Sequence, residues 1–279
     1  MPSSWFIRHW PLEKVLEDES TVDNQKIQEQ LFEDAEIAVH YEDICSINHR
    51  KYAKDNQRKV QRFRELQEDG GFVCADYPLI KRMRVGIAEP KSEFYCSEEF
   101  HFLKRLRLEK SFDVSTNMRV RLLAGAPRQG TLLKWHVIGD RLEHLISGKI
   151  EESWEWLLPY EKETVCQEYL RKEFHLLYLL LPFGRALEDI DIAGVTEEGQ
   201  RIYALLTNEE KEDKLKEKVQ DLSRFDGVRV FFCPENESAK KLQREFKGRI
   251  TFVWSNKIVW EWLSAPRNRR YKEMLFSGV

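Results

Sequence analysis

The stretch DIDIAGVTEEGQRIYALLT, residues 189–207, decides the fold that we expect for this chain. Two short apolar runs flank the polar turn TEEGQ, and apolar runs of this length around a glycine-containing turn predict a β-hairpin. Asp189 and Asp191 stand at the start of the first strand, and Thr207 ends the second. The hairpin therefore either presents a metal-binding site or is a structural element only.

A regular series of elements surrounds this hairpin. Hydrophobic spacing predicts helices, and short all-apolar runs predict buried strands. The resulting order is helix, hairpin, helix, strand, helix, strand, helix, and it predicts a mixed sheet flanked by helices, hence an α/β (α+β) protein. The expected helices cover residues 153–174, 209–225, 236–248 and 257–265, and the expected strands cover 228–234 and 250–254.

This order resembles the restriction-endonuclease-like fold of the PD-(D/E)xK superfamily, in its Mrr-like branch, over residues 160–275. In that family a helix bearing a Glu precedes a hairpin whose strands present an Asp and then (E/Q)-x-K. The matching residues are Glu163 on the helix, Asp191 on the first strand and LLT, residues 205–207, on the second. The resemblance implies a catalytic set of Glu163, Asp191 and Thr207, with Glu163 and Asp191 as ligands of Mg²⁺ if the site is active.

Half of the family motif is missing from this chain. Mg²⁺ prefers oxygen ligands, and in an active member it activates a water while the lysine stabilises charge on the phosphate. Leu205 offers no lone pair and Thr207 no positive charge, although Glu209, Glu210 or Lys211 are possible substitutes. We therefore expect an inactive or weak nuclease fold, with an active Mg²⁺-dependent DNA endonuclease as the alternative. The acids also fit a plain strand entry that faces solvent.

Basic residues gather in the N-terminal half although the formal net charge is −3. Local clusters of this kind can follow the phosphates of a nucleic acid, and the alternative is a solvated helix face. The apolar spacing within 49–69 predicts one helix for the densest cluster. This cluster is our predicted nucleic-acid-binding site, with DNA as the expected ligand: Arg50, Lys51, Lys54, Arg58, Lys59, Arg62 and Arg64.

Residues 1–115 also resemble the EVE/PUA-like group of base-sensing domains. The resemblance is carried by GGFVCADYPLIKRMRVGIAEPKSEF, residues 70–94, followed by FHFLKRLRLEK, residues 100–110. It implies a mixed β-barrel with an aromatic pocket in which a flipped, modified base can stack. The candidate pocket residues are Trp5, Trp10, Tyr41 and Tyr77, and the alternative for each is core packing.

The remaining expectations concern organisation and compartment. We expect domains at 1–115 and 151–279 with a connector at 116–150. The five cysteines include no CxxC pair, which favours free thiols in a reducing cytoplasm. No apolar run approaches the ~20 residues that span a membrane. The function expected is that of a restriction or phage-defence protein that binds nucleic acid, as a homodimer or with partner subunits. A further alternative is a protein–protein interaction subunit without a nucleic-acid role.

Overall fold

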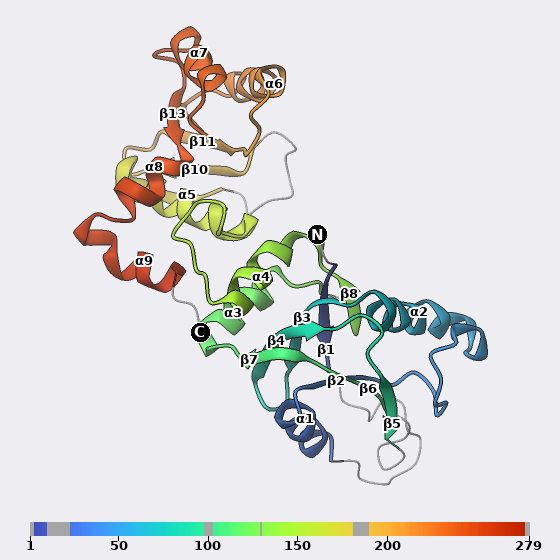
Figure 1. Ribbon diagram of the computed structural model, residues 1–279. Helices are drawn as coiled ribbons and strands as arrows, with labels where there is room; N and C mark the ends of the chain where they lie inside the picture. Colours follow the sequence, from blue (N-terminus) through green and yellow to red (C-terminus); the bar gives the residue numbers. More distant parts are fainter. Residues whose placement is uncertain (1–2, 10–22, 98–102, 129, 181–189, 277–279) are drawn as a thin grey trace. The chain divides into compact units, whose positions relative to one another are not determined.

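The computed structural model describes residues 3–9, 23–97, 103–128, 130–180 and 190–276. Trp10, Glu188 and Asp189 lie outside these residues. The chain divides into two compact units, residues 1–150 and residues 151–276. Figure 1 shows the helices and strands of the two units.

Unit 1 contains two sheets, and its strands join in the orders β7-β4-β3-β1-β8 and β2-β6-β5. The β1–β3 pair is parallel and the other pairs are antiparallel. The elements are β1 (Ser4–Arg8), α1 (Asn24–Glu33), β2 (Glu36–Val39), the 3-10 turn η2 (His49–Lys51), α2 (Lys54–Asp69), β3 (Gly71–Tyr77), β4 (Arg82–Ala88), β5 (Phe94–Ser97), β6 (Leu103–Arg107), β7 (Glu109–Asp113), α3 (Thr116–Gly125), β8 (Leu132–Lys134), the 3-10 turn η3 (His136–Ile138) and α4 (Gly139–Ser147).

The described strands of unit 1 do not form the expected β-barrel. Both sheets are open, because β7 and β8 at the ends of one sheet, and β2 and β5 at the ends of the other, each pair with a single described neighbour. Residues 116–150, which we expected to be a connector, add β8 to β1 and belong to unit 1. The α/β class itself is confirmed.

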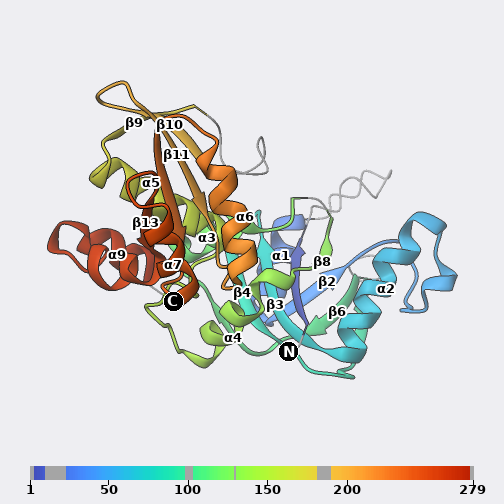
Figure 2. The ribbon, with the colours of Figure 1, turned by 90° about the horizontal axis from the view of Figure 1, so that it is seen from above.

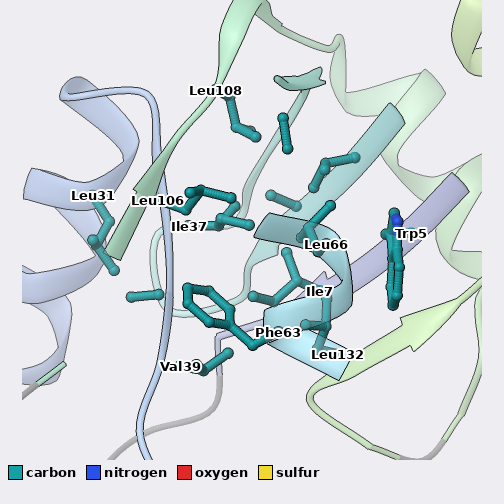
Figure 3. Close-up of a cluster of buried hydrophobic side chains, with 14 of the residues drawn as sticks. Trp5, Ile7, Leu31, Ile37, Val39, Phe63, Leu66, Leu106, Leu108 and Leu132 are labelled. Carbon is teal, nitrogen blue, oxygen red and sulfur yellow. The ribbon is translucent and has the colours of Figure 1, made fainter. Parts of the chain in front are cut away.

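The core of unit 1 lies between its sheets and α2 (Figure 3). Phe63 and Leu66 of α2 are completely buried and pack with Ile7 of β1 and Leu132 of β8. These two α2 residues and Val60 are spaced three apart, so they share one face of the helix, and the helix ends at Gly70, whose φ is 69°. The opposite face of α2 is left to charged residues.

Unit 2 is built on one sheet of order β13-β12-β11-β10-β9. Strands β9, β10 and β11 are antiparallel, whereas β12 and β13 run parallel to β11. The elements are α5 (Pro159–Glu173), β9 (Leu176–Leu179), β10 (Ile192–Thr196), β11 (Arg201–Leu206), α6 (Glu212–Ser223), β12 (Val228–Cys233), α7 (Glu237–Glu245), β13 (Thr251–Trp254), the helical turn α8 (Ser255–Lys257), the π-helix η4 (Ile258–Trp262), the 3-10 turn η5 (Pro266–Asn268) and α9 (Arg269–Phe276).

Helices of unit 2 pack on its sheet (Figure 2). Leu215 and Val219 of α6 and Leu242 of α7 pack with Phe231 of β12. Tyr169 of α5 packs instead against Phe232, with ring centroids 5.8 Å apart. Because neighbouring residues of a strand point to opposite faces, α5 lies on the other side of the sheet from α6 and α7. The predicted hairpin is present as β10 and β11, and β9 is an additional strand.

The cysteines differ in part from the prediction of five free thiols. Cys45 and Cys96 form a disulfide, with Cα atoms 5.7 Å apart. Cys74, Cys166 and Cys233 are free and buried. The prediction is wrong for the bonded pair because spacing along the chain says nothing about proximity: the loop after β2 brings Cys45 against β5.

Candidate functional site

Two carboxylates of the predicted site come from separate elements of unit 2. Glu163 lies on α5, and Asp191 directly precedes β10. The Asp191 amide donates to the Ala204 carbonyl at 3.1 Å, and its carboxylate accepts from the Leu206 amide at 2.6 Å. These bonds hold Asp191 beside the carboxyl end of β11.

The two carboxyl groups interact electrostatically. Burial raises the pKa of Glu163, and the charge of Asp191 raises it further. Burial also raises the pKa of Asp191, against the Leu206 amide bond and the charge of Lys218, which both lower it. The structure thus brings this predicted pair together, and a proton or a cation between the two groups would relieve their unfavourable charge.

Leu205 and Thr207, which stand where the family motif has Glu or Gln and then Lys, supply no further metal ligand. Leu205 is 3% exposed and packs in the apolar cluster with Leu215 and Val219. Thr207 is buried, and its hydroxyl accepts from the Glu209 amide at 3.1 Å. Among the described residues, no group of three or more His, Cys, Asp or Glu could hold a metal ion. The second strand of the hairpin therefore adds neither a carboxylate nor a positive charge to Glu163 and Asp191.

Lys218 of α6 nevertheless places a positive charge near Asp191. Lys218 is half-buried and lowers the pKa of Asp191, whereas Glu209, Glu210 and Lys211 are exposed. Sequence reasoning missed Lys218. The available signal was its position three residues after Leu215 and directly before Val219, both inward-facing, so that its aliphatic stem borders the buried face of the helix.

Cys166 and Lys162 also surround the pair on α5. Cys166 is completely buried, and burial followed by the charges of Asp191 and Glu163 raises the pKa of its thiol. Burial lowers the pKa of Lys162, whose ammonium lies 5.7 Å from the centre of the Trp154 ring. Cys166 is thus a protonated thiol and Lys162 is held against an aromatic ring, so neither is placed to replace the missing carboxylate.

The predicted nucleic-acid-binding residues lie on η2 and α2 of unit 1. Three of the seven have partners: Lys59 donates to Asn56 at 3.0 Å, Arg62 to the Leu132 carbonyl at 3.3 Å, and Arg64 pairs with Glu68 at 2.7 Å. The other four are exposed, and none forms an ion pair with any part of the chain that the structure describes. We call these four the basic surface: Arg50, Lys51, Lys54 and Arg58.

The predicted base pocket is not supported by the aromatic residues. Trp5 and Tyr77 are completely buried, and the Tyr77 hydroxyl donates to the Glu36 carbonyl at 2.6 Å. Neither ring has a free face for a base, so the structure corrects the prediction for both. Tyr41 is half-buried and packs against the core of unit 1, beneath the Lys59 ammonium at 5.7 Å. Trp10 lies outside the described residues.

Comparisons with known proteins give little information about this chain. No family model matches the chain, and no curated protein matches it. The chain is similar to a solved structure, the crystal structure of a repair endonuclease from Pyrococcus abyssi, at 14% sequence identity and a TM-score of 0.24. The similarity covers 62% of this chain and 76% of that chain. A TM-score this low establishes no shared fold, so the residues themselves must carry any functional conclusion.

The described helices also bear on membrane association. Not one of them combines the length and the apolar character that a membrane-spanning segment requires.

Proposed function

We propose that this chain is a nucleic-acid-binding protein with a nuclease-like domain whose incomplete site does not cut efficiently. The observation that carries the proposal is the basic surface, which consists of four exposed cations without ion pairs among the described residues. Such cations gain most from phosphates, because binding releases the counterions condensed on the nucleic acid. An ion-paired lysine or arginine would first have to give up its own carboxylate.

The geometry of the basic surface supports DNA as a ligand. Lys54 and Arg58 are four residues apart on α2, so both side chains leave the same face of the helix. Arg50 and Lys51 lie just before the helix in η2. A row of charges of this kind can follow one strand of a duplex without reading its bases.

The residues around Asp191 explain why we expect little hydrolysis of nucleic acid. Leu205 is committed to the apolar core, so the second strand of the hairpin adds no carboxylate to Glu163 and Asp191. The Thr207 hydroxyl is already engaged by the Glu209 amide. The proposed protein therefore binds nucleic acid more effectively than it hydrolyses it.

A second candidate function is an active Mg²⁺-dependent endonuclease with substitute residues. Its specific support is the charge of Lys218 beside Asp191, which could take the role of the absent motif lysine. Glu163 and Asp191 would then hold the metal, which supplies an activated water when bound. The remaining ligands of the metal would be water and phosphate oxygens, as is usual for Mg²⁺.

A cleavage assay separates the two candidates. Wild type, Asp191→Asn and Lys218→Ala are incubated with labelled duplex DNA and either Mg²⁺ or Mn²⁺, and binding is measured in parallel. The proposal predicts that all three proteins bind and that none cuts appreciably. Strong cutting that Asp191→Asn and Lys218→Ala abolish would establish the second candidate. Absence of binding to DNA or RNA at low salt would refute both and favour a protein–protein interaction subunit.

A further inference from the structure

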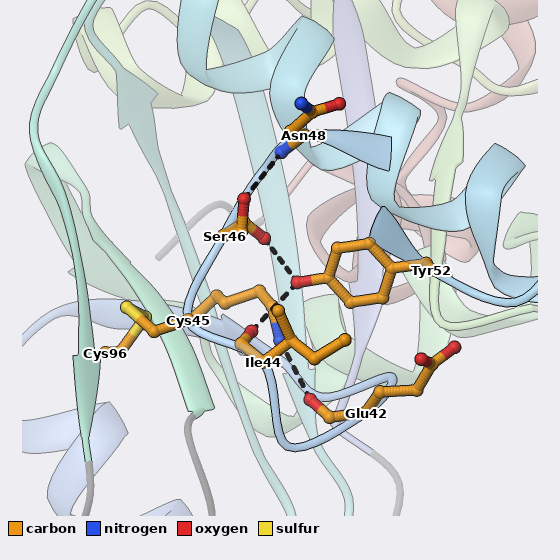
Figure 4. The surroundings of a disulfide bond; sticks show 8 residues. Glu42, Ile44, Cys45, Ser46, Asn48, Tyr52 and Cys96 are labelled. Carbon is orange, nitrogen blue, oxygen red and sulfur yellow. Dashed lines mark hydrogen bonds between the residues drawn. A yellow bond between two sulfur atoms is a disulfide. The ribbon is translucent and has the colours of Figure 1, made fainter. Parts of the chain in front are cut away.

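The disulfide between Cys45 and Cys96 joins the loop of residues 40–48 to strand β5 (Figure 4). Cys45 is exposed, whereas Cys96 is half-buried. Among the described strands β5 pairs with β6 alone, so it is the edge of its sheet. The bond is therefore open to solvent, and it links an irregular loop to a regular element.

The same loop supports the start of α2. Ala53, the residue before the helix, has a methyl side chain that cannot cap, and its amide donates instead to the Glu42 carboxylate at 2.9 Å. That carboxylate also accepts from the Asn56 side chain at 3.0 Å. Glu42 thus satisfies an amide that is otherwise left unpaired at a helix start, and its negative charge is favourable there.

Further hydrogen bonds join the loop to the turn before α2 (Figure 4). The Tyr52 hydroxyl contacts the carbonyl oxygens of Ile44, at 2.9 Å, and Ser46. The Asn48 side chain accepts from the Arg50 amide at 3.2 Å. Residues on both sides of Cys45 therefore hold the backbone that carries Arg50, Lys51 and Lys54.

This loop contributes little apolar burial of its own. The His40 side chain is 2% exposed, and Tyr41 and Ile47 pack at the border of the core, whereas the other residues of 40–48 are half-buried or exposed. A segment with few buried contacts opens locally at low free-energy cost, and a crosslink restricts that opening. The disulfide is thus a covalent constraint on the loop, beside the hydrogen bonds of Glu42 and Tyr52 that hold the start of α2.

We propose that Cys45–Cys96 is a reducible latch that keeps the basic surface in its binding conformation. This regulation rests on the proposed nucleic-acid-binding function. The reductant is a dithiol, whose thiolate attacks Sγ of Cys45, the more exposed of the two residues, while Cys96 leaves as a thiolate and takes up a proton. The second thiol of the reductant then releases Cys45 as a thiol. Two electrons pass to the protein, and the dithiol ends as a disulfide.

Reduction weakens binding because the ordered loop becomes one of several conformations. The apparent dissociation constant rises by the inverse of the fraction that is still ordered. An ordered fraction of about one tenth to one third raises the constant about three- to tenfold. The fold of unit 1 persists, since its core residues lie outside the loop.

Hydrogen exchange on the full chain tests the latch without any ligand. The oxidised protein is compared with protein reduced by dithiothreitol, and the proposal predicts faster exchange in residues 41–58 on reduction but unchanged exchange in α6. Cys45→Ser/Cys96→Ser should exchange like the reduced protein and should not respond to dithiothreitol. Equal exchange of residues 41–58 in the oxidised and reduced proteins would overturn the proposal, whatever the binding result.

A binding titration tests the functional part with a short fluorescein-labelled duplex DNA as the probe. The oxidised protein should bind more tightly than the reduced protein and the double serine variant, by the factor given above. Equal affinities alongside faster exchange would overturn the regulation while leaving nucleic-acid binding intact. If the oxidised protein does not bind DNA at low salt, the proposed function fails, and the regulation fails with it, but the exchange result still decides whether the latch exists.

Discussion

At the scale of single residues, His9 is a buried histidine whose hydrogen bonds require the neutral form. Its Nδ1 lies 3.0 Å from the Asp76 carbonyl, and its Nε2 accepts from the Ala38 amide at 3.2 Å. Burial lowers the pKa of His9 from 6.5 to about 4, although the bond to Asp76 opposes the shift. The His9 imidazole is therefore protonated at a higher pH in the unfolded chain than in the folded chain.

This difference predicts a pH dependence of stability. His9 contributes its full stabilisation above pH 6.5, and the contribution is lost as the pH falls from 6.5 to about 4. A shift of this size corresponds to a loss of at most about 3 kcal/mol. Urea unfolding between pH 7 and pH 4 measures it. His9→Gln should flatten the dependence of the unfolding free energy on pH in this window. The control His136→Gln, at an exposed position, should not. Equal pH dependence for wild type and His9→Gln would refute the role of His9.

The candidate site could be predicted from sequence only where a motif fixes the spacing. Glu163 and Asp191 were predicted because the family places them relative to the hairpin; the charge of Asp191 raises the pKa of Glu163, and their catalytic role stays a prediction. Lys218 was missed because its approach to Asp191 depends on how α6 packs against the sheet, which no local pattern specifies. Trp5 and Tyr77 were misassigned because aromatic content alone does not distinguish a pocket from a core.

At the scale of elements, the antiparallel strands of unit 2 depend on Gly194 in β10. A Cβ atom at this position would lie 2.4 Å from Cδ1 of Leu176 and 2.5 Å from the carbonyl oxygen of Tyr178, both in β9. Those separations are far below van der Waals contact, so β9 could not keep its register beside any larger residue. Gly194 therefore allows β9 to close on β10.

Gly194→Ala should accordingly destabilise the protein by about 1–3 kcal/mol, the cost typical of overpacking a filled site. Denaturant unfolding followed by a probe of unit 2, such as hydrogen exchange in β9 and β10, measures the change. Gly139→Ala is the matched control, because its Cβ would meet the Ser4 hydroxyl at an ordinary 3.5 Å. A Gly194→Ala protein as stable as wild type would show that β9 is not held against β10.

The elements of unit 2 were easier to predict than those of unit 1. Turn chemistry and apolar period specify the hairpin, α6 and α7 locally, and the structure has them close to the expected residues. In unit 1 the parallel pairing of β1 with β3 joins residues far apart in sequence. Such long-range pairing decides whether strands close into a barrel or stay as open sheets, and no short stretch encodes it.

At the scale of the whole molecule, the net charge of −3 conceals an uneven distribution of charged residues over the two units. The four exposed cations of the basic surface lie in unit 1, whereas unit 2 holds Glu163 and Asp191, where the charge of Asp191 raises the pKa of Glu163. Composition could indicate the first feature but not which lysines and arginines lack partners, because ion pairs form between side chains that only the fold brings together. Lys240 and Lys241 on α7, for example, lie beside Glu235 and Glu212.

The salt dependence of DNA binding tests the central claim most directly. Affinity for a labelled duplex is measured over a range of salt concentrations for wild type, Lys54→Ala/Arg58→Ala and the ion-paired control Lys240→Ala/Lys241→Ala. If the basic surface contacts phosphates, removing two of its cations should weaken binding and reduce the log–log salt slope by about 2. The control should match wild type. Binding by Lys54→Ala/Arg58→Ala with the affinity and slope of wild type would contradict the account.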